Sequence, residues 1–142
     1  MNAINQVLLV LHFVGLAMGL SVSIANGVMG GLMAGSTPEE RAVLGRFPPM
    51  MGRIGKIGLT LLWVSGAILV ETRWGGFATL PWQFHAKLTA VVLLTLVVIY
   101  IHLQEGQLRR GNASAAARIE AAGKVTPLLA VTAVVFAVLT FD

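Results

Sequence analysis

The chain has 142 residues, of which 56% are hydrophobic and 11% are charged, and its mean hydropathy is +0.83. This composition excludes an ordinary soluble domain and indicates an integral membrane protein. The chain contains no cysteine, which also excludes disulfides and thiolate metal sites. The formal net charge of +4 gives no reason to expect a nucleic-acid partner, because basic residues near membrane spans account for it.

Four apolar runs are long enough to cross a bilayer core of about 30 Å, which takes roughly 20 helical residues. They cover about residues 4–29, 51–70, 82–103 and 125–141. The first run lacks a basic start and is longer than the apolar part of a secretion signal, so we expect a permanent span. The predicted fold class is all-α, a single domain over residues 1–142 that forms an integral membrane four-helix bundle.

Small residues line one face of the first span, where Gly15 and Gly19 form a G-x-x-x-G pair on the same face as His12. Such a face lets another helix approach closely, in the same chain or in a homodimer. It equally suits a flat macrocycle lying against the helix, and the sequence leaves both interpretations open. The second span carries a comparable set at Gly52, Gly55 and Gly58.

Two connections are expected to contain short cytoplasmic helices. Thr37 is a suitable cap for a helix over about residues 38–46, with Pro38 in its first turn. The third connection is rich in alanine and predicts a helix over about residues 105–122, interrupted at Gly111-Asn112.

The basic residues predict the orientation of the bundle. They gather in the first and third connections, at Arg41, Arg46, Arg53, Lys56, Arg109, Arg110, Arg118 and Lys124. The positive-inside rule places these connections in the cytoplasm and both termini on the outer side. We therefore expect a multi-pass protein of the bacterial inner membrane, with the lipid bilayer as its first partner.

Histidines inside apolar spans are the strongest indication of function, because ionisable groups are costly in the membrane. A rise of 1.5 Å per residue places His12 and His85 in the same outer half, on spans one and three, and His102 about 25 Å further in than His85. Two imidazoles at similar depth suit axial ligation of a haem between helices. The alternative is that each histidine only forms hydrogen bonds, and His102 is expected to be an interface residue.

Lys87 lies two residues after His85 and so points about 200° away around the helix. Its ammonium group either reaches the outer headgroups along its flexible stem or serves a site. In a site it would pair with an anionic group such as a haem propionate, or donate a proton.

The segment Trp82-Gln83-Phe84-His85-Ala86-Lys87-Leu88 and the later Tyr100-Ile101-His102 resemble the third span of HemJ-type four-helix membrane proteins. Leu11-His12-Phe13-Val14-Gly15 is similar to the first-span histidine motif of that family. The resemblance implies haem b binding and oxidation of protoporphyrinogen IX, with His12 and Lys87 as key positions and His85 as a further candidate. CopD-type copper-resistance membrane domains share a similar plan.

The sequence thus predicts a membrane protein that binds haem b through His12 and His85, with Gly15 and Gly19 beside the cofactor and Lys87 as the catalytic candidate. Its role would be electron transfer or protoporphyrinogen oxidase-like oxidoreductase activity, with a porphyrin substrate or a membrane redox partner. One alternative is a cofactor-free membrane subunit or small carrier. Another is copper handling by His12, His85 and some of the methionines at positions 1, 18, 29, 33, 50 and 51.

Overall fold

The computed structural model describes residues 2–141, and its long elements are all helices. In chain order they are α1 (Ala3–Ala34), α2 (Pro38–Leu44), α3 (Phe47–Trp74), the 3-10 helix η1 (Phe77–Thr79), α4 (Trp82–Arg109) and α5 (Ser114–Phe141). Within the described residues, four helices are long and apolar enough to cross a membrane. The all-α prediction is confirmed, and the four helices fit a multi-pass membrane protein.

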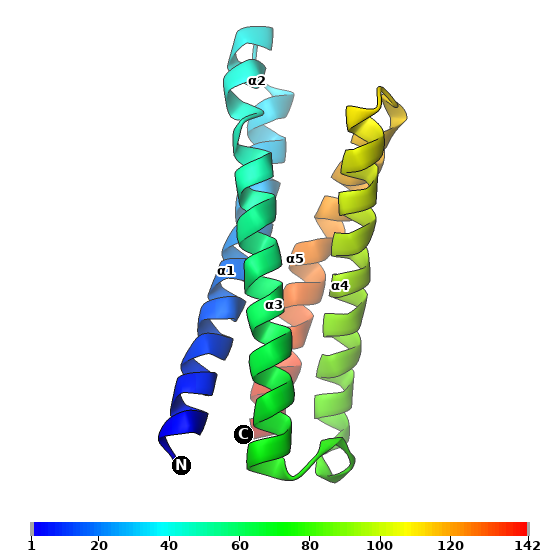
Figure 1. The fold of residues 1–142 in the computed structure, drawn as a ribbon. Coiled ribbons are helices and arrows are strands. Elements are labelled where there is room, and N and C mark those ends of the chain that lie inside the picture. The colour runs from blue at the N-terminus through cyan, green and yellow to red at the C-terminus, as the bar shows by residue number, and fades with distance from the viewer. Residues whose placement is uncertain (1, 142) are drawn as a thin grey trace.

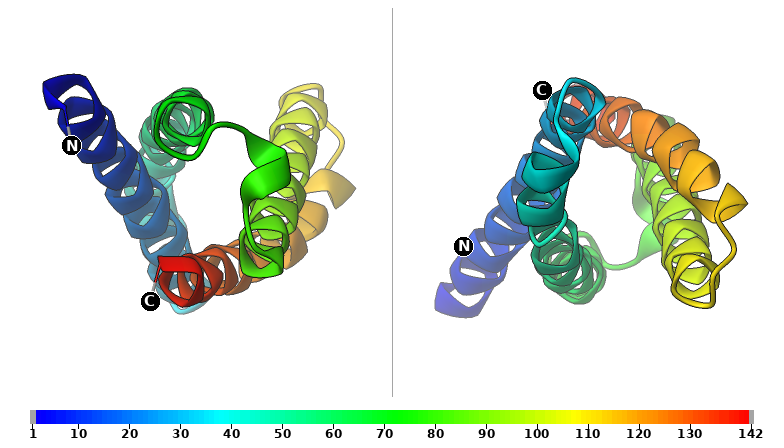
Figure 2. Two further views of the ribbon diagram at one scale, coloured as in Figure 1. Left: turned by 90° about the horizontal axis from the view of Figure 1, so that it is seen from below. Right: turned by 90° about the horizontal axis from the view of Figure 1, so that it is seen from above.

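The long helices run side by side in an elongated bundle (Figure 1). We call the end where α1 begins and α5 ends the terminal end, and the opposite end, which carries α2, the α2 end. Seen along the bundle, the helices surround its axis in the order α1, α3, α4, α5 (Figure 2). The backbones of α1 and α3 pack closely, as do those of α4 and α5, and α1 also meets α5. The bundle is therefore two tight helix pairs that join mainly through α1 and α5.

The α1–α3 pair is closest where two glycines meet. A Cβ atom on Gly15 would lie 2.7 Å from the backbone oxygen of Gly58, and one on Gly58 would lie 2.9 Å from the oxygen of Gly15. Side chains longer than hydrogen would push the backbones apart at this crossing, which is the role of small residues in membrane helix packing. Gly15 therefore takes the helix-packing role that the sequence had left open.

Further contacts along this pair recur every seven residues. The Thr72 hydroxyl donates to Asn5 Oδ1 over 2.9 Å near the terminal end. Seven residues further along α1, and seven earlier on α3, His12 meets Ser65. A seven-residue step keeps contacts on one face of each of two packed helices. Gly58 lies a further seven residues before Ser65, and Gly15, three residues after His12, lies on the same face of α1.

The helix ends follow the local sequence. Thr37 accepts a hydrogen bond from the Glu40 amide over 3.3 Å, and Pro38 begins α2, which confirms the predicted cap. Helix α2 ends at Leu44, two residues before the predicted end. Glycine is required after α3, because Gly75 has φ of 70° in the left-handed region.

The α4–α5 connection differs from the prediction of a separate helix over residues 105–122. Its first residues extend α4 to Arg109, Gly111 makes the turn with φ of 90°, and the rest begins α5 at Ser114. Pro127 lies inside α5 and cannot donate to the carbonyl of Gly123. The Thr126 hydroxyl bonds that carbonyl instead over 3.0 Å, so the helix continues through the proline.

The glycine crossing predicts unequal effects of alanine along α1. Gly15→Ala should destabilise the bundle by roughly 1–3 kcal/mol, because the added methyl group meets the α3 backbone. Gly27→Ala is the matched control, since nothing lies within 4 Å of a Cβ atom there. Thermal unfolding in detergent measures both variants. Equal melting temperatures would contradict the crossing.

Candidate functional site in the bundle interior

The candidate site begins with His12, which α1 directs toward α3. His12 Nδ1 lies 3.1 Å from the hydroxyl oxygen of Ser65, a residue that is only 2% exposed. The Ser65 hydroxyl donates its single proton to the backbone oxygen of Leu61. It can therefore only accept from His12, which places the imidazole proton on Nδ1 and the lone pair of the neutral ring on Nε2.

One further residue of α3 borders the ring. A Cβ atom on Gly66 would lie 3.1 Å from His12 Cε1, so the glycine leaves room for the flat imidazole. The Ser65-Gly66 pair thus provides a polar anchor and a space at adjacent positions.

Lys87 completes the polar group from the α4 side. It is half-buried, and its charge is close enough to act on the imidazole of His12. Its Nζ lies 5.9 Å from the centre of the Phe84 ring. Gln83, one turn earlier on the same face, has a buried side-chain oxygen for which no hydrogen-bond partner is found among the described residues. The interior near the terminal end therefore holds a ligand-type nitrogen, a cation and an unsatisfied acceptor.

The other two histidines lie elsewhere. His85 is exposed, with its ring centroid 6.2 Å from that of its neighbour Phe84. Lys87, two residues further on, points about 200° away from His85 around α4, and the pairing of His85 with His12 stays a prediction. His102 is near the α2 end and contacts Lys56. Sequence reasoning had separated His102 from the other two, and the structure keeps it apart from His12.

The two glycines predicted beside a cofactor have different surroundings. Gly15 is buried against α3 at the helix crossing. Gly19, one turn further along α1, has nothing within 4 Å of the position of a Cβ atom. Clearance for a planar group stays a prediction, and of the two positions Gly19 is the one with open space.

Sequence reasoning missed Ser65 and Gln83. Serine and glutamine can form hydrogen bonds between membrane helices without any further role, and neither belongs to a recognisable ligand motif. The available signal was a shared spacing of polar and small residues. On α3, Ser65 and Thr72 follow Gly58 at steps of seven residues, and on α1 His12 follows Asn5 at the same step. They become meaningful only once α1 and α3 are known to pair in antiparallel.

No group of three or more His, Asp or Glu side chains arranged to hold a metal ion occurs within residues 2–141. Comparisons with protein-family models, with curated proteins and with solved structures find no match to this chain. The functional argument therefore depends on the geometry around His12.

Ser65→Ala should remove the preference of His12 for protonation on Nδ1, because the hydroxyl that accepts from Nδ1 is lost. In ¹⁵N spectra of histidine-labelled protein, the His12 signals should move from the Nδ1-protonated tautomer toward a mixture, while those of His102 stay unchanged. His12→Ala assigns the signals. A wild-type His12 protonated on Nε2 would contradict the hydrogen-bond assignment.

Proposed function

We propose that the protein is an integral membrane haem b protein in which His12 supplies an iron ligand. The single observation that supports this is the hydrogen bond from His12 Nδ1 to Ser65 in the interior of a membrane bundle. Histidines that bind metals usually donate their other ring N–H to a fixed acceptor, which orients the ring and leaves the second nitrogen for the metal. His12 has this arrangement.

The surrounding residues fit a haem in their chemistry. His12 offers a ligand nitrogen and Lys87 a cation suited to a propionate. The side-chain amide of Gln83 can donate an N–H to a propionate, although its buried oxygen cannot accept from one. When bound, a haem supplies one-electron redox chemistry for electron transfer or for porphyrinogen oxidation. His12 would hold the cofactor, and Lys87 would bind its carboxylate or donate a proton to a substrate. His85 as a second ligand stays a prediction, which requires its side chain to turn inward.

The proposal includes the orientation predicted by the basic residues, with the terminal end outside and the α2 end in the cytoplasm of a bacterium. The His12 site then lies in the outer half of the inner membrane. A reporter enzyme fused after residue 142 should be active in the periplasm, and one fused after Arg110 in the cytoplasm.

The second candidate is a cofactor-free membrane subunit. It is favoured by the contact between Gly15 and Gly58, which gives one small-residue position a packing role without a ligand. A cofactor-free subunit does not explain why the apolar helices carry His12, Lys87 and Gln83, so we place haem binding first.

Haem content should depend on His12 and not on His102. We expect His12→Ala to lose nearly all haem when the protein is purified from haem-supplemented cells, because the ligand nitrogen is removed. His102→Ala, the matched control near the other end, should retain it. His85→Ala tests the second ligand: if His85 binds the iron, the variant should change from a low-spin to a high-spin haem spectrum. Haem loss in the His102 variant alone would overturn the assignment.

Lys87→Gln should leave membrane expression near the wild-type level and lower the haem midpoint potential by roughly 60 mV, equivalent to a tenfold change for a one-electron couple. The reason is that a nearby cation favours the more negative, reduced state. Redox titration measures the potential, and Lys87→Arg is the control that keeps the charge. An unchanged potential in the glutamine variant would make Lys87 an interfacial anchor.

A further inference from the structure

Helices α3 and α4 are joined by two polar bridges, one toward the α2 end and one near the middle of both helices. Lys56 Nζ lies 2.9 Å from His102 Nδ1, and the Trp63 indole donates to the Thr95 hydroxyl over 2.9 Å. The bridges are seven residues apart on both helices, about 10 Å at the helical rise. These side chains span a seam where the two backbones approach closely at few points.

A groove of about 270 Å³ opens on this seam beside the Lys56–His102 bridge. Its apolar walls come from Leu59 on α3 and from Val98 and Ile99 on α4, with Thr60 completing the lining. Lys56, Thr60, Ile99 and His102 are all exposed, so the groove is open along the outside of the bundle. A membrane lipid can therefore reach it from the side.

The polar end of the groove presents hydrogen-bond donors. An ammonium group only donates, so Lys56 must donate to His102 Nδ1, and the neutral imidazole then carries its proton on Nε2. The Glu105 carboxylate is 3.6 Å from the same Nδ1, beyond hydrogen-bond distance. Nε2–H and the two other N–H groups of Lys56 are all donors, which suits a ligand whose polar atoms only accept.

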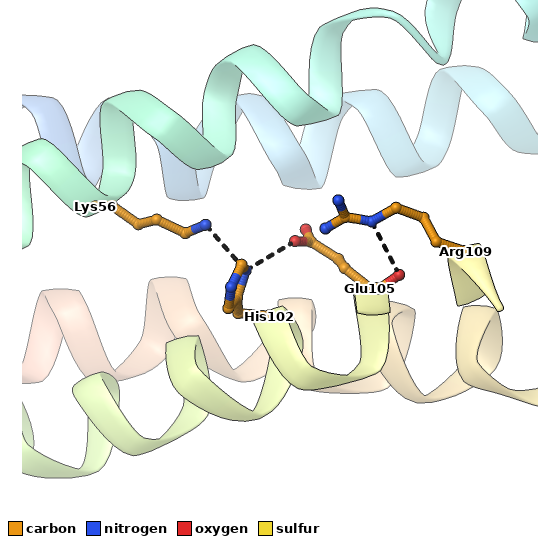
Figure 3. A network of polar contacts seen from close by, with 4 residues as sticks. All are labelled: Lys56, His102, Glu105 and Arg109. Carbon is orange, nitrogen blue, oxygen red and sulfur yellow. Dashed lines mark hydrogen bonds and ion pairs between the residues drawn. The ribbon is translucent and has the colours of Figure 1, made fainter. Parts of the chain in front are cut away.

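The charges around this end favour an anion. Figure 3 shows Lys56, His102, Glu105 and Arg109 gathered between α3 and α4. Arg109 Nε donates to the backbone oxygen of Glu105 over 3.5 Å. Two permanent cations thus face one carboxylate, and the group has a positive balance when His102 is neutral.

The groove also lies at the boundary of the apolar spans. The residues from Ile57 to Val70 on α3 include no charged side chain, and neither do those from Leu88 to Leu103 on α4 apart from the neutral His102. Lys56 and His102 mark the ends of these stretches. Lipid phosphates occupy this depth, where acyl chains begin.

We propose that the α3–α4 groove is a binding site for an anionic phospholipid. The phosphate diester accepts hydrogen bonds from Lys56 and His102, and one acyl chain lies along Leu59, Val98 and Ile99 toward the Trp63–Thr95 bridge. Charge complementarity and the apolar walls select a lipid over a free anion. The site shares no residue with the His12 cluster, so the proposal stands independently of haem binding.

The direct test uses the wild-type chain in neutral detergent with phosphatidylglycerol that carries a photoreactive acyl chain. We expect crosslinks at Leu59, Val98 or Ile99, competed by unlabelled phosphatidylglycerol and neither by phosphatidylcholine of the same chains nor by inorganic phosphate. Equal competition by phosphatidylcholine would overturn the selection for an anion. Competition by millimolar inorganic phosphate would show a free-anion site, and crosslinks confined to other helices would exclude the groove.

Variants test the donors separately. Lys56→Gln should weaken retention of phosphatidylglycerol in native mass spectra by about tenfold, the loss of one charge-assisted hydrogen bond. Lys124→Gln is the matched control, because it removes the same charge near the same end of the bundle, where Lys124 pairs with Glu120 at 3.7 Å. Lys56→Arg should restore binding. Equal losses in the Lys56→Gln and Lys124→Gln proteins would show that lipid retention depends only on net charge, and would overturn the site.

Discussion

The backbone contact between Gly15 and Gly58 is the constraint on which the rest of the structure depends. It fixes both the distance and the register of α1 against α3, and this register sets Asn5 against Thr72 and His12 against Ser65. In a membrane no hydrophobic effect drives the two helices together, so close packing and interhelical hydrogen bonds supply the specificity. The position of His12 against α3 therefore follows from the contact between two glycines.

The α1–α3 and α3–α4 interfaces are built differently. Each of them carries a different one of the two proposals. The α1–α3 seam is tight and holds His12 in one orientation, as a metal ligand requires. The α3–α4 seam is spanned by the long side chains of Lys56 and Trp63, and it leaves an apolar groove open to the membrane. A single helix thus borders both the proposed ligand site at His12 and the proposed lipid groove at Lys56.

Composition and span length were enough to predict four apolar helices, and the Thr37-Pro38 pair was enough to predict where α2 begins, because these signals are local. The chain turns at the predicted interruption, Gly111-Asn112, but the residues on either side of it extend α4 and begin α5 and do not form a separate helix. The pairing of His12 with His85 followed from depth alone. Depth does not fix rotation about the helix axis, and in the structure His85 is exposed while Lys87 is half-buried. Ser65 could not be recognised from the sequence, because its role is to accept a hydrogen bond from His12 on the neighbouring helix.

The most direct test of the central claim, that His12 is an oriented iron ligand, is the absorption spectrum of the intact protein purified from haem-supplemented cells, before and after dithionite reduction. We expect a Soret band that shifts on reduction and a pyridine haemochrome of the b type in about one-to-one ratio with protein, for the one His12 site of the chain. A folded, monodisperse protein without porphyrin absorbance would contradict the claim and favour the cofactor-free subunit.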